Sequence, residues 1–421
     1  MTPAPLQPAR IEWADDGTPL APDFSDRYHG HAGALVQAQH VFLAGNDLPR
    51  RWQGRDDFTI VETGFGLGHN FLATWQAWRD DPQRCRRLHH VALDAYPPTR
   101  AELQRAHATA RPAPAAELAA ALQAAWPPRV PGLHLLLFDG GAVRLLLALG
   151  DVHEVLPQWQ VQADAFYLDG FAPDRNPRMW DRDVLNALAR RAAPDATLAT
   201  WSVAHALRDG LAATGFRCEL HPGVGGKREV LRAVHAPRHR LPRREPPTDR
   251  RALVVGAGLA GACAAASLAA QGFEVTVFER APAPASATSG NPAGMFHATV
   301  HRDDGPYARL FRAGALHTAR LLQTLPAGAV PHSTAGLLRL ERVLDLPAMQ
   351  QLLATLGLDP DFVTALSAEQ ASARAGVHLS HPAWCYGQGG WVSPPRLVAQ
   401  RLAQPGVHFR GGCEVAHIRR D

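Results

Sequence analysis

Two glycine-rich segments in the chain have the residue types and spacing of nucleotide-binding turns. The first is Glu62-Thr-Gly-Phe-Gly-Leu-Gly68, and the second is Gly256-Ala-Gly-Leu-Ala-Gly261. Each follows an apolar run typical of a strand and precedes an apolar stretch typical of a helix, so each can place a nucleotide at a strand-to-helix turn. The sequence therefore predicts two cofactors and two reactions.

The first segment has the form expected for S-adenosylmethionine, because it is a GxGxG pattern with a preceding acid rather than the dinucleotide GxGxxG. Asp94 and Asp151 follow later apolar runs, where an acid can accept hydrogen bonds from a ribose. Each acid taken alone is better explained as a solvated strand end, whereas both in register with the glycines favour a cofactor. The expected cofactor contacts are Glu62, Gly64, Phe65, Gly66, Gly68, Asn70, Asp94 and Asp151.

A carboxylate suited to proton transfer lies in the segment Tyr167-Leu-Asp-Gly-Phe-Ala-Pro173. An Asp that ends a strand lies at the edge where open α/β sheets bind ligands. Methyl transfer needs a positioned nucleophile and, when the nucleophile starts as an ammonium, a base that removes its proton. We expect Asp169 to hold and deprotonate this nucleophile.

Four nearby residues are weaker predictions for substrate contacts. Phe171 and Trp180 either stack on a nucleic-acid base or pack in the core. Lys227 and Arg228 follow a glycine-rich loop and either contact a phosphate or carboxylate or form an ordinary surface turn. The sequence alone leaves both pairs of alternatives open.

The second segment is a dinucleotide fingerprint. Gly256 is expected to allow the tight turn, and Gly258 to allow the close approach of a pyrophosphate. Gly261 is expected to allow the helix to pack on the strand, and Glu279 to accept a hydrogen bond from the ribose hydroxyl. The small residues of Ala287–Gly294 and the segment Gly389–Leu397 favour FAD over NAD, and the latter resembles glycine-oxidase-like and D-amino-acid-oxidase-like flavoproteins. Ser289 and Asn291 are predicted flavin contacts, with simple loop structure as the alternative.

The elements that position these residues form two α/β domains. Predicted strands at 58–61, 90–93, 165–168, 197–200 and 229–234 alternate with helical segments at 70–78, 100–126 and 184–192, and 143–149 is a further candidate element. This pattern predicts a largely parallel sheet. Prolines and charges replace any apolar period at 235–249, which predicts a linker. The predicted parts are a Rossmann-like methyltransferase domain at 1–235, a linker at 236–250 and an FAD-binding Rossmann domain at 251–421.

Composition sets broad limits on the class of protein. The 421 residues are 46% hydrophobic and 19% charged, as is ordinary for globular proteins, and the net charge of +4 permits an RNA partner without requiring one. The five cysteines are scattered, so we expect neither disulfides nor a metal site. The absence of a signal-like or membrane-spanning run predicts a cytoplasmic protein without membrane contact. Oligomeric state is left open.

Several motifs resemble the MnmC family of bacterial bifunctional enzymes that modify the wobble uridine of tRNA. The resemblance is carried by Glu62–Leu72, by Leu168-Asp-Gly-Phe-Ala-Pro with Asn176-Pro-Arg-Met-Trp, and by Gly226-Lys-Arg-Glu, and it extends over residues 1–235. It implies FAD-dependent removal of a carboxymethyl group from 5-carboxymethylaminomethyl(-2-thio)uridine, followed by methylation of the exposed 5-aminomethyl group. Asp169 is then the base for that amine, and tRNA is the partner.

The resemblance also implies that the FAD domain is incomplete, since members of the family continue beyond the counterpart of Val415. Two other interpretations remain at this stage. One is a small-molecule amine methyltransferase fused to an amino-acid-oxidase-like flavoprotein. The other is a tRNA-binding protein whose flavin domain is vestigial.

Overall fold

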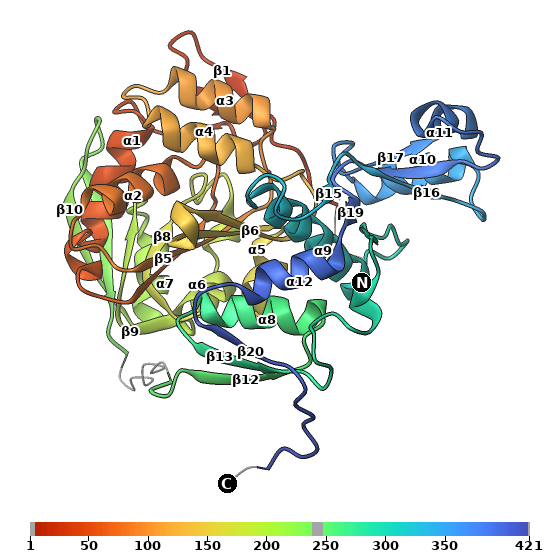
Figure 1. The fold of residues 1–421 in the computed structure, drawn as a ribbon. Helices are drawn as coiled ribbons and strands as arrows, with labels where there is room; N and C mark the ends of the chain where they lie inside the picture. Colours follow the sequence, from red (N-terminus) through yellow and green to blue (C-terminus); the bar gives the residue numbers. More distant parts are fainter. Residues whose placement is uncertain (1–4, 238–246, 420–421) are drawn as a thin grey trace. The chain divides into compact units, whose positions relative to one another are not determined.

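The computed structural model describes residues 5–237 and 247–419 (Figure 1). By their internal contacts, residues 3–244 with 357–359 form one compact unit, and residues 245–356 and 360–421 form most of a second. The central part of the predicted linker, residues 238–246, lies outside the described residues. The predicted domain boundaries at 235 and 251 therefore stay a prediction.

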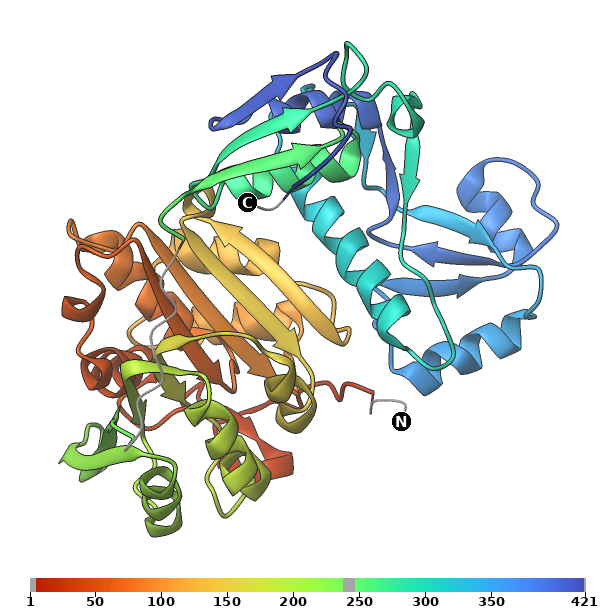
Figure 2. The ribbon, with the colours of Figure 1, turned by 90° about the horizontal axis from the view of Figure 1, so that it is seen from below.

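The first unit is built on an eight-stranded sheet with the order β10-β11-β9-β8-β4-β5-β7-β6. The central strands β9, β8, β4, β5 and β7 pair in parallel, and Figure 2 shows several of them side by side in orange and yellow. The strands are β4 Asp57–Thr63, β5 Arg87–Asp94, β6 Gly132–Phe138, β7 Val143–Leu149, β8 Ala163–Leu168, β9 Ala192–Thr200, β10 Phe216–Pro222 and β11 Glu229–His235.

Helices cover both faces of this sheet because successive strand side chains point to opposite sides and both sides are apolar. On one face, Phe58 and Ile60 of β4 pack in a core shared with Phe71 and Leu103. On the other face, Val61 packs in a separate core. The first face carries α2 His69–Asp80, α3 Arg100–Thr109 and α4 Ala116–Ala125, and the second carries α5 Val152–Val155, α6 Arg182–Ala189 and α7 His205–Ala213.

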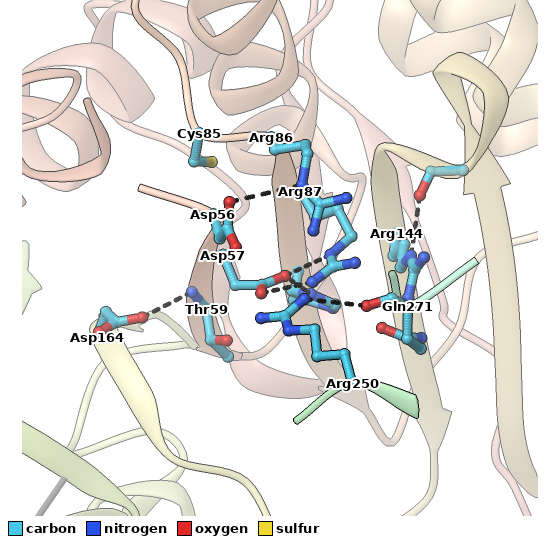
Figure 3. A network of polar contacts seen from close by, with 12 residues as sticks. Asp56, Asp57, Thr59, Cys85, Arg86, Arg87, Arg144, Asp164, Arg250 and Gln271 are labelled. Atoms are coloured by element: carbon cyan, nitrogen blue, oxygen red, sulfur yellow. Dashed lines mark hydrogen bonds and ion pairs between the residues drawn. The ribbon is translucent and has the colours of Figure 1, made fainter. Parts of the chain in front are cut away.

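A polar network fixes the amino-terminal edge of the sheet, where β4 and β5 begin (Figure 3). Asp57 accepts hydrogen bonds from Arg87 Nε at 2.6 Å and Nη2 at 2.7 Å, and the two residues are also register partners. Burial alone raises the pKa of Asp57, but its hydrogen bonds with Arg87 and His89 hold this pKa below the ordinary value. Asp164 of β8 accepts from Thr59 N at 2.9 Å, so three parallel strands are joined in register.

The second unit begins with a parallel sheet of β12 Arg251–Val255, β13 Glu274–Phe278 and β20 Val407–Arg410. Figure 1 shows α8 Leu259–Ala269 and α12 Pro394–Leu402 next to this sheet, and their Ala262, Ala265 and Val398 share a core with Val275 and Val277. This is the strand-helix-strand unit that the second fingerprint predicts.

The rest of the second unit consists of two small antiparallel sheets and three more helices. One sheet joins β14 Gly294–Phe296, β19 Gly390–Val392 and β15 His332–Ser333, and the other joins β16 Leu337–Leu340, β18 Ala383–Tyr386 and β17 Val363–Leu366. The helices are α9 Pro306–Gln323, α10 Leu346–Leu356 and α11 Ala368–Ala375.

The α/β fold class predicted for both parts is confirmed, with three differences in detail. The large sheet is mixed, because β6, β10 and β11 pair antiparallel with their neighbours. The alanine-rich segment 100–126 forms two helices, since Pro112 and Pro114 remove backbone donors between them. A small sheet of β1 Glu12–Trp13, β2 Pro19–Ala21 and β3 Asp26–Arg27 precedes the large one.

Candidate functional site

A pocket of about 330 Å³ opens where β4, β5 and β8 end, which is the carboxyl edge of the parallel strands. Its size falls within the range of small-molecule sites. Several predicted residues line it together: Gly64, Phe65, Gly66, Asn70, Asp94, Asp151, Asp169, Phe171 and Lys227. Residues that are distant in the sequence therefore meet at one sheet edge, as expected for an open α/β fold.

Four residues of the glycine loop, Gly64 to Leu67, line this pocket, whereas Gly68 lies outside the lining and its expected cofactor contact stays a prediction. Gly64, Gly66 and Gly68 have φ values of +77°, +53° and +74°, the left-handed region that side chains disfavour. A Cβ on Gly64 would lie 2.9 Å from the backbone oxygen of Asp169, so the two segments approach too closely for any side chain. The loop is held against the next strand because Gly64 N and Phe65 N both donate to Leu93 O at 3.0 Å.

Asp94 ends β5 and is 8% exposed. Its Oδ2 accepts from Gly66 N at 2.6 Å and its Oδ1 from Tyr96 N at 2.7 Å, so the carboxylate ties the glycine loop to its own strand end. Burial raises the pKa of Asp94 to about 6. Asp151, the other predicted ribose acceptor, caps α5 by accepting from His153 N at 2.9 Å and faces the pocket beside Arg178.

Asp169 follows β8 on the pocket wall and is surrounded by hydrogen-bond donors. Its Oδ1 accepts from Gly170 N at 2.9 Å and from Trp201 Nε1 at 3.1 Å, and its Oδ2 accepts from Asn70 Nδ2 at 2.8 Å. A carboxylate has about four acceptor positions, so these bonds leave one on Oδ2. Burial, followed by the nearby charge of Glu62, raises the pKa of Asp169 to about 7. The group is therefore poised to exchange a proton near neutral pH.

Glu62 lies outside the pocket lining, so its expected contact with the cofactor stays a prediction. Its side chain is fully buried, accepts from Asn70 Nδ2 at 2.7 Å and pairs with His90 Nε2 at 2.8 Å. Asn70 thus bridges the carboxylates of Glu62 and Asp169. Glu62 acts on the site by orienting Asn70 and by raising the pKa of Asp169.

Trp180 packs in the core, so of the two alternatives for this residue the structure favours packing. It is 7% exposed, belongs to the core cluster that includes Val184, and donates from Nε1 to Phe171 O at 2.8 Å. Phe171 does line the pocket, stacked on Phe24 with ring centroids 4.4 Å apart. Phe171 therefore joins Tyr28, Phe65, Tyr96 and Trp201 as the aromatic residues of the pocket lining.

Lys227 and Arg228 separate in the structure. Lys227 lines the pocket with its Nζ 3.6 Å from the ring centroid of Trp201, whereas Arg228 lies outside the lining. Both residues are exposed to solvent. Trp201 itself was missed from the sequence, although it directly follows a strand that the sequence predicts at 197–200. The position after a parallel strand was the available signal.

The second fingerprint forms the expected close turn. Gly256 has a φ of +96°, and a Cβ on Gly261 would lie 1.9 Å from Gly256 O, so α8 packs on the turn only without a side chain there. Glu279 ends β13 and accepts from Ala257 N at 2.9 Å and Ala281 N at 3.0 Å. These bonds lower its pKa, which keeps a carboxylate at the position of a ribose acceptor.

The two loop predictions of the second unit differ in their placement. Ser289 Oγ accepts from Leu259 N at 3.0 Å at the start of α8, beside Gly258. Asn291 is exposed and donates from Nδ2 to Thr288 O at 3.0 Å within its own loop. Ser289 is therefore hydrogen-bonded to the first residue of α8, and flavin contacts by Ser289 and Asn291 both stay predictions.

Two negative findings concern residues 5–237 and 247–419. In that part of the chain, no helix is both long and apolar enough to cross a membrane. The same residues hold no cluster of three or more His, Cys, Asp or Glu side chains arranged to bind a metal ion.

The fold and site define a two-part protein of the methyltransferase and flavoprotein classes. Residues 113–236 match the family described as S-adenosyl-L-methionine-dependent methyltransferase, and residues 251–421 match FAD dependent oxidoreductase. Over its whole length the chain is similar to proteins of the MnmC family. It is 50% identical to the "tRNA 5-methylaminomethyl-2-thiouridine biosynthesis bifunctional protein MnmC" of Methylibium petroleiphilum over 430 residues, and 47% identical to that of Burkholderia vietnamiensis over 428 residues.

These alignments cover 100% and 99% of this chain, and the chain spans 65% of the length of each of the two relatives. Among solved structures, MNMC2 from Aquifex aeolicus is similar at 22% identity with a TM-score of 0.44, over 57% of this chain and 75% of that one.

Proposed function

We propose that the first unit methylates the 5-aminomethyl group of the wobble uridine in tRNA, with S-adenosylmethionine as donor. We further propose that the second unit uses FAD to remove the carboxymethyl group of 5-carboxymethylaminomethyl(-2-thio)uridine, which exposes that amine. The names of the relatives and the matched families support this proposal. A tRNA substrate also implies a cytoplasmic protein.

The observation that carries the first activity is the setting of Asp169. S-adenosylmethionine, when bound, supplies a methyl group to an amine and leaves with the electron pair of its carbon–sulfur bond. The amine can attack only after losing a proton, because a primary ammonium has no free lone pair. The open acceptor position on Asp169 Oδ2 receives this proton, while Trp201 and Asn70 hold the carboxylate in place.

The raised pKa of Asp169 suits this step. At its ordinary value of 3.8 the carboxylate would be a poor proton acceptor, and at about 7 it is closer to the ammonium yet still largely ionised in mildly alkaline solution. Burial beside Glu62 is the cause of the shift. The buried Glu62 thus tunes a base that it does not touch directly.

The pocket residues fit the proposed donor. Asp94 and Asp151 present carboxylate oxygens at strand ends where a ribose can bind, and Gly64 and Gly66 let the backbone approach closely. Phe65 supplies apolar lining beside them. Phe171 and Tyr28 line the same pocket, which supports the proposal that an aromatic side chain stacks on the uracil ring.

The second unit fits a flavin dinucleotide at its turn. FAD, when bound, accepts two electrons from a carbon–nitrogen bond. Gly256, Gly258 and Gly261 open space for a pyrophosphate at the start of α8, and Glu279 offers an ionised acceptor for the ribose.

The test is mass analysis of nucleosides from tRNA incubated with the 421-residue chain and S-adenosylmethionine. With tRNA that carries 5-aminomethyluridine, we expect conversion to 5-methylaminomethyluridine. An unchanged nucleoside in the presence of bound donor would refute the methyltransferase proposal. For the flavin, the visible spectrum of the purified chain after addition of FAD is the direct measure, and a colourless protein would refute that half.

A further inference from the structure

The indole ring of Trp201 contacts Asp169 through its edge and the ammonium of Lys227 through its face. Trp201 donates from Nε1 to Asp169 Oδ1 at 3.1 Å, and the ammonium of Lys227 lies 3.6 Å from the ring centroid. The face of Trp is the strongest cation–π partner among the side chains. The pocket therefore contains a built cation site next to the predicted base.

Two carboxylates add to the preference of this site for a cation. Asp26 and Asp169 both line the pocket, and both favour the charged form of Lys227. Burial of Lys227 favours its neutral form and outweighs the effect of the two carboxylates, so the pKa of Lys227 is lowered. The ammonium of Lys227 is consequently held at some cost in desolvation, and it lies over the ring face of Trp201.

The chain lets Lys227 leave this position. It follows Gly225 and Gly226, with φ values of +63° and +89°, in the loop between β10 and β11. The loop is closed by Gly223 N donating to Arg228 O at 2.9 Å, so the backbone is fixed while the four-carbon stem of the lysine can swing outward. Lys227 is also the sole lysine in the sequence.

We propose that the face of Trp201 beside Asp169 is the binding site of the substrate's ammonium, and that Lys227 occupies this site until the substrate displaces it. The inference rests on the proposed amine methylation. A substrate ammonium on this face lies next to the carboxylate that takes its proton. Lys227 thus acts as an internal competitor, and it keeps a cation beside Asp169 while the site awaits substrate.

The competitor role predicts a gain of affinity on removal of the charge. In the full chain, Lys227→Met keeps a long unbranched side chain and removes the ammonium. We expect this variant to bind the nucleoside 5-aminomethyluridine about two- to fivefold more tightly in calorimetry, the range of a partly exposed cation–π contact. A structural role or a phosphate contact for Lys227 predicts no gain with a nucleoside, which lacks phosphate.

The matched control is Arg217→Met, which removes an exposed cation from β10 outside the pocket lining. We expect its nucleoside affinity to equal that of the unmodified chain. Trp201→Leu in the Lys227→Met background should cancel the gain, because the ring face is then absent. Thermal unfolding of each variant checks that the pocket is intact.

Three results would overturn the inference. They are an unchanged or weaker nucleoside affinity in Lys227→Met, a gain that survives Trp201→Leu, and a gain for S-adenosylmethionine instead of the nucleoside, which would assign the face to the sulfonium. The proposed function is tested separately by methylation of tRNA by the unmodified chain. Methylation without the affinity gain rejects the competitor role alone.

Discussion

Asp169 is the residue on which the chemistry depends, and its replacement gives the clearest test. In Asp169→Asn the amide keeps its size but cannot accept the proton of an ammonium at neutral pH. We expect methyl transfer to tRNA to fall by roughly 10²–10⁴-fold, while S-adenosylmethionine still binds. Single-turnover kinetics and calorimetry measure the two quantities.

The control for this variant is Asp174→Asn, a nearby carboxylate in the same connection whose side chain is 76% exposed and forms an ion pair with Arg175. It should methylate tRNA at the rate of the unmodified chain. If Asp169→Asn were as active as Asp174→Asn, Asp169 would lose its role as the base.

The raised pKa of Asp169 also has a consequence for stability. The carboxyl has a pKa of about 7 in the folded protein against 3.8 as its ordinary value, so between these pH values the native state retains a proton that the unfolded chain releases. The contribution of this group to the unfolding free energy therefore falls as pH rises from about 4 to 7.

Asp169→Asn removes that pH dependence, since an amide does not ionise. We expect the variant to unfold at a higher temperature than the unmodified chain at pH 8.5, by a few degrees, since 1 kcal/mol corresponds to roughly 2–4 °C for a domain of this size. Near pH 4 the difference should shrink. Calorimetric scans at the two pH values measure it, and a difference that is the same at both would contradict the raised pKa.

At the scale of elements, the turn between β4 and α2 must pass close to the turn after β8. Gly64 makes this possible, because any Cβ there would meet Asp169 O at 2.9 Å. Gly64→Ala should therefore push the two turns apart and weaken S-adenosylmethionine binding at least tenfold, since the loop and Asp169 shape the same pocket. Calorimetric titration gives the affinity.

Gly54 offers a control that separates backbone strain from crowding. Its φ of +69° is similar to the +77° of Gly64, but a Cβ at Gly54 would meet nothing within 4 Å. Gly54→Ala should cost stability, about 1–2 kcal/mol from the left-handed conformation, without loss of donor affinity. Equal losses of affinity in both variants would mean that crowding at Gly64 is unimportant.

Several strand ends could be predicted from sequence because an acid closely follows an apolar run. Asp94, Asp151, Asp169 and Glu279 all lie at or just after the end of a strand, and a glycine adjoins Asp151 and Asp169. Strand β6 was not predicted, although Asp139-Gly-Gly141 after it is a hairpin signal between two apolar runs. Neighbouring strands with long apolar runs are hard to separate by period alone.

The depth of a side chain could not be predicted, because depth depends on how distant segments pack. Glu62 and Trp180 have the residue types of binding residues, yet both are covered by neighbours. Trp201 has an ordinary sequence context, yet it contacts both Asp169 and Lys227. These assignments require the three-dimensional arrangement of β4, β8 and β9.

At the scale of the whole molecule, the proposed reactions form a sequence in which the product of the second unit is the substrate of the first. Each unit has a variant that should stop its own step alone. Asp169→Asn removes the base of methylation, and Gly261→Ala blocks the FAD turn, because its Cβ would lie 1.9 Å from Gly256 O.

With tRNA that carries 5-carboxymethylaminomethyluridine, FAD and S-adenosylmethionine, the Asp169→Asn chain should accumulate the 5-aminomethyl nucleoside. The Gly261→Ala chain should leave the starting nucleoside unchanged but still methylate tRNA that already carries the 5-aminomethyl group. Gly314→Ala is the control, because a Cβ there meets nothing within 4 Å on a helix that alanine favours. Mass analysis of the nucleosides distinguishes the outcomes. Loss of methylation in Gly261→Ala would show that the two units do not work independently. If the unmodified chain left the starting nucleoside unchanged, the proposed oxidative step would be refuted, whereas the proposed methyl transfer would not be affected.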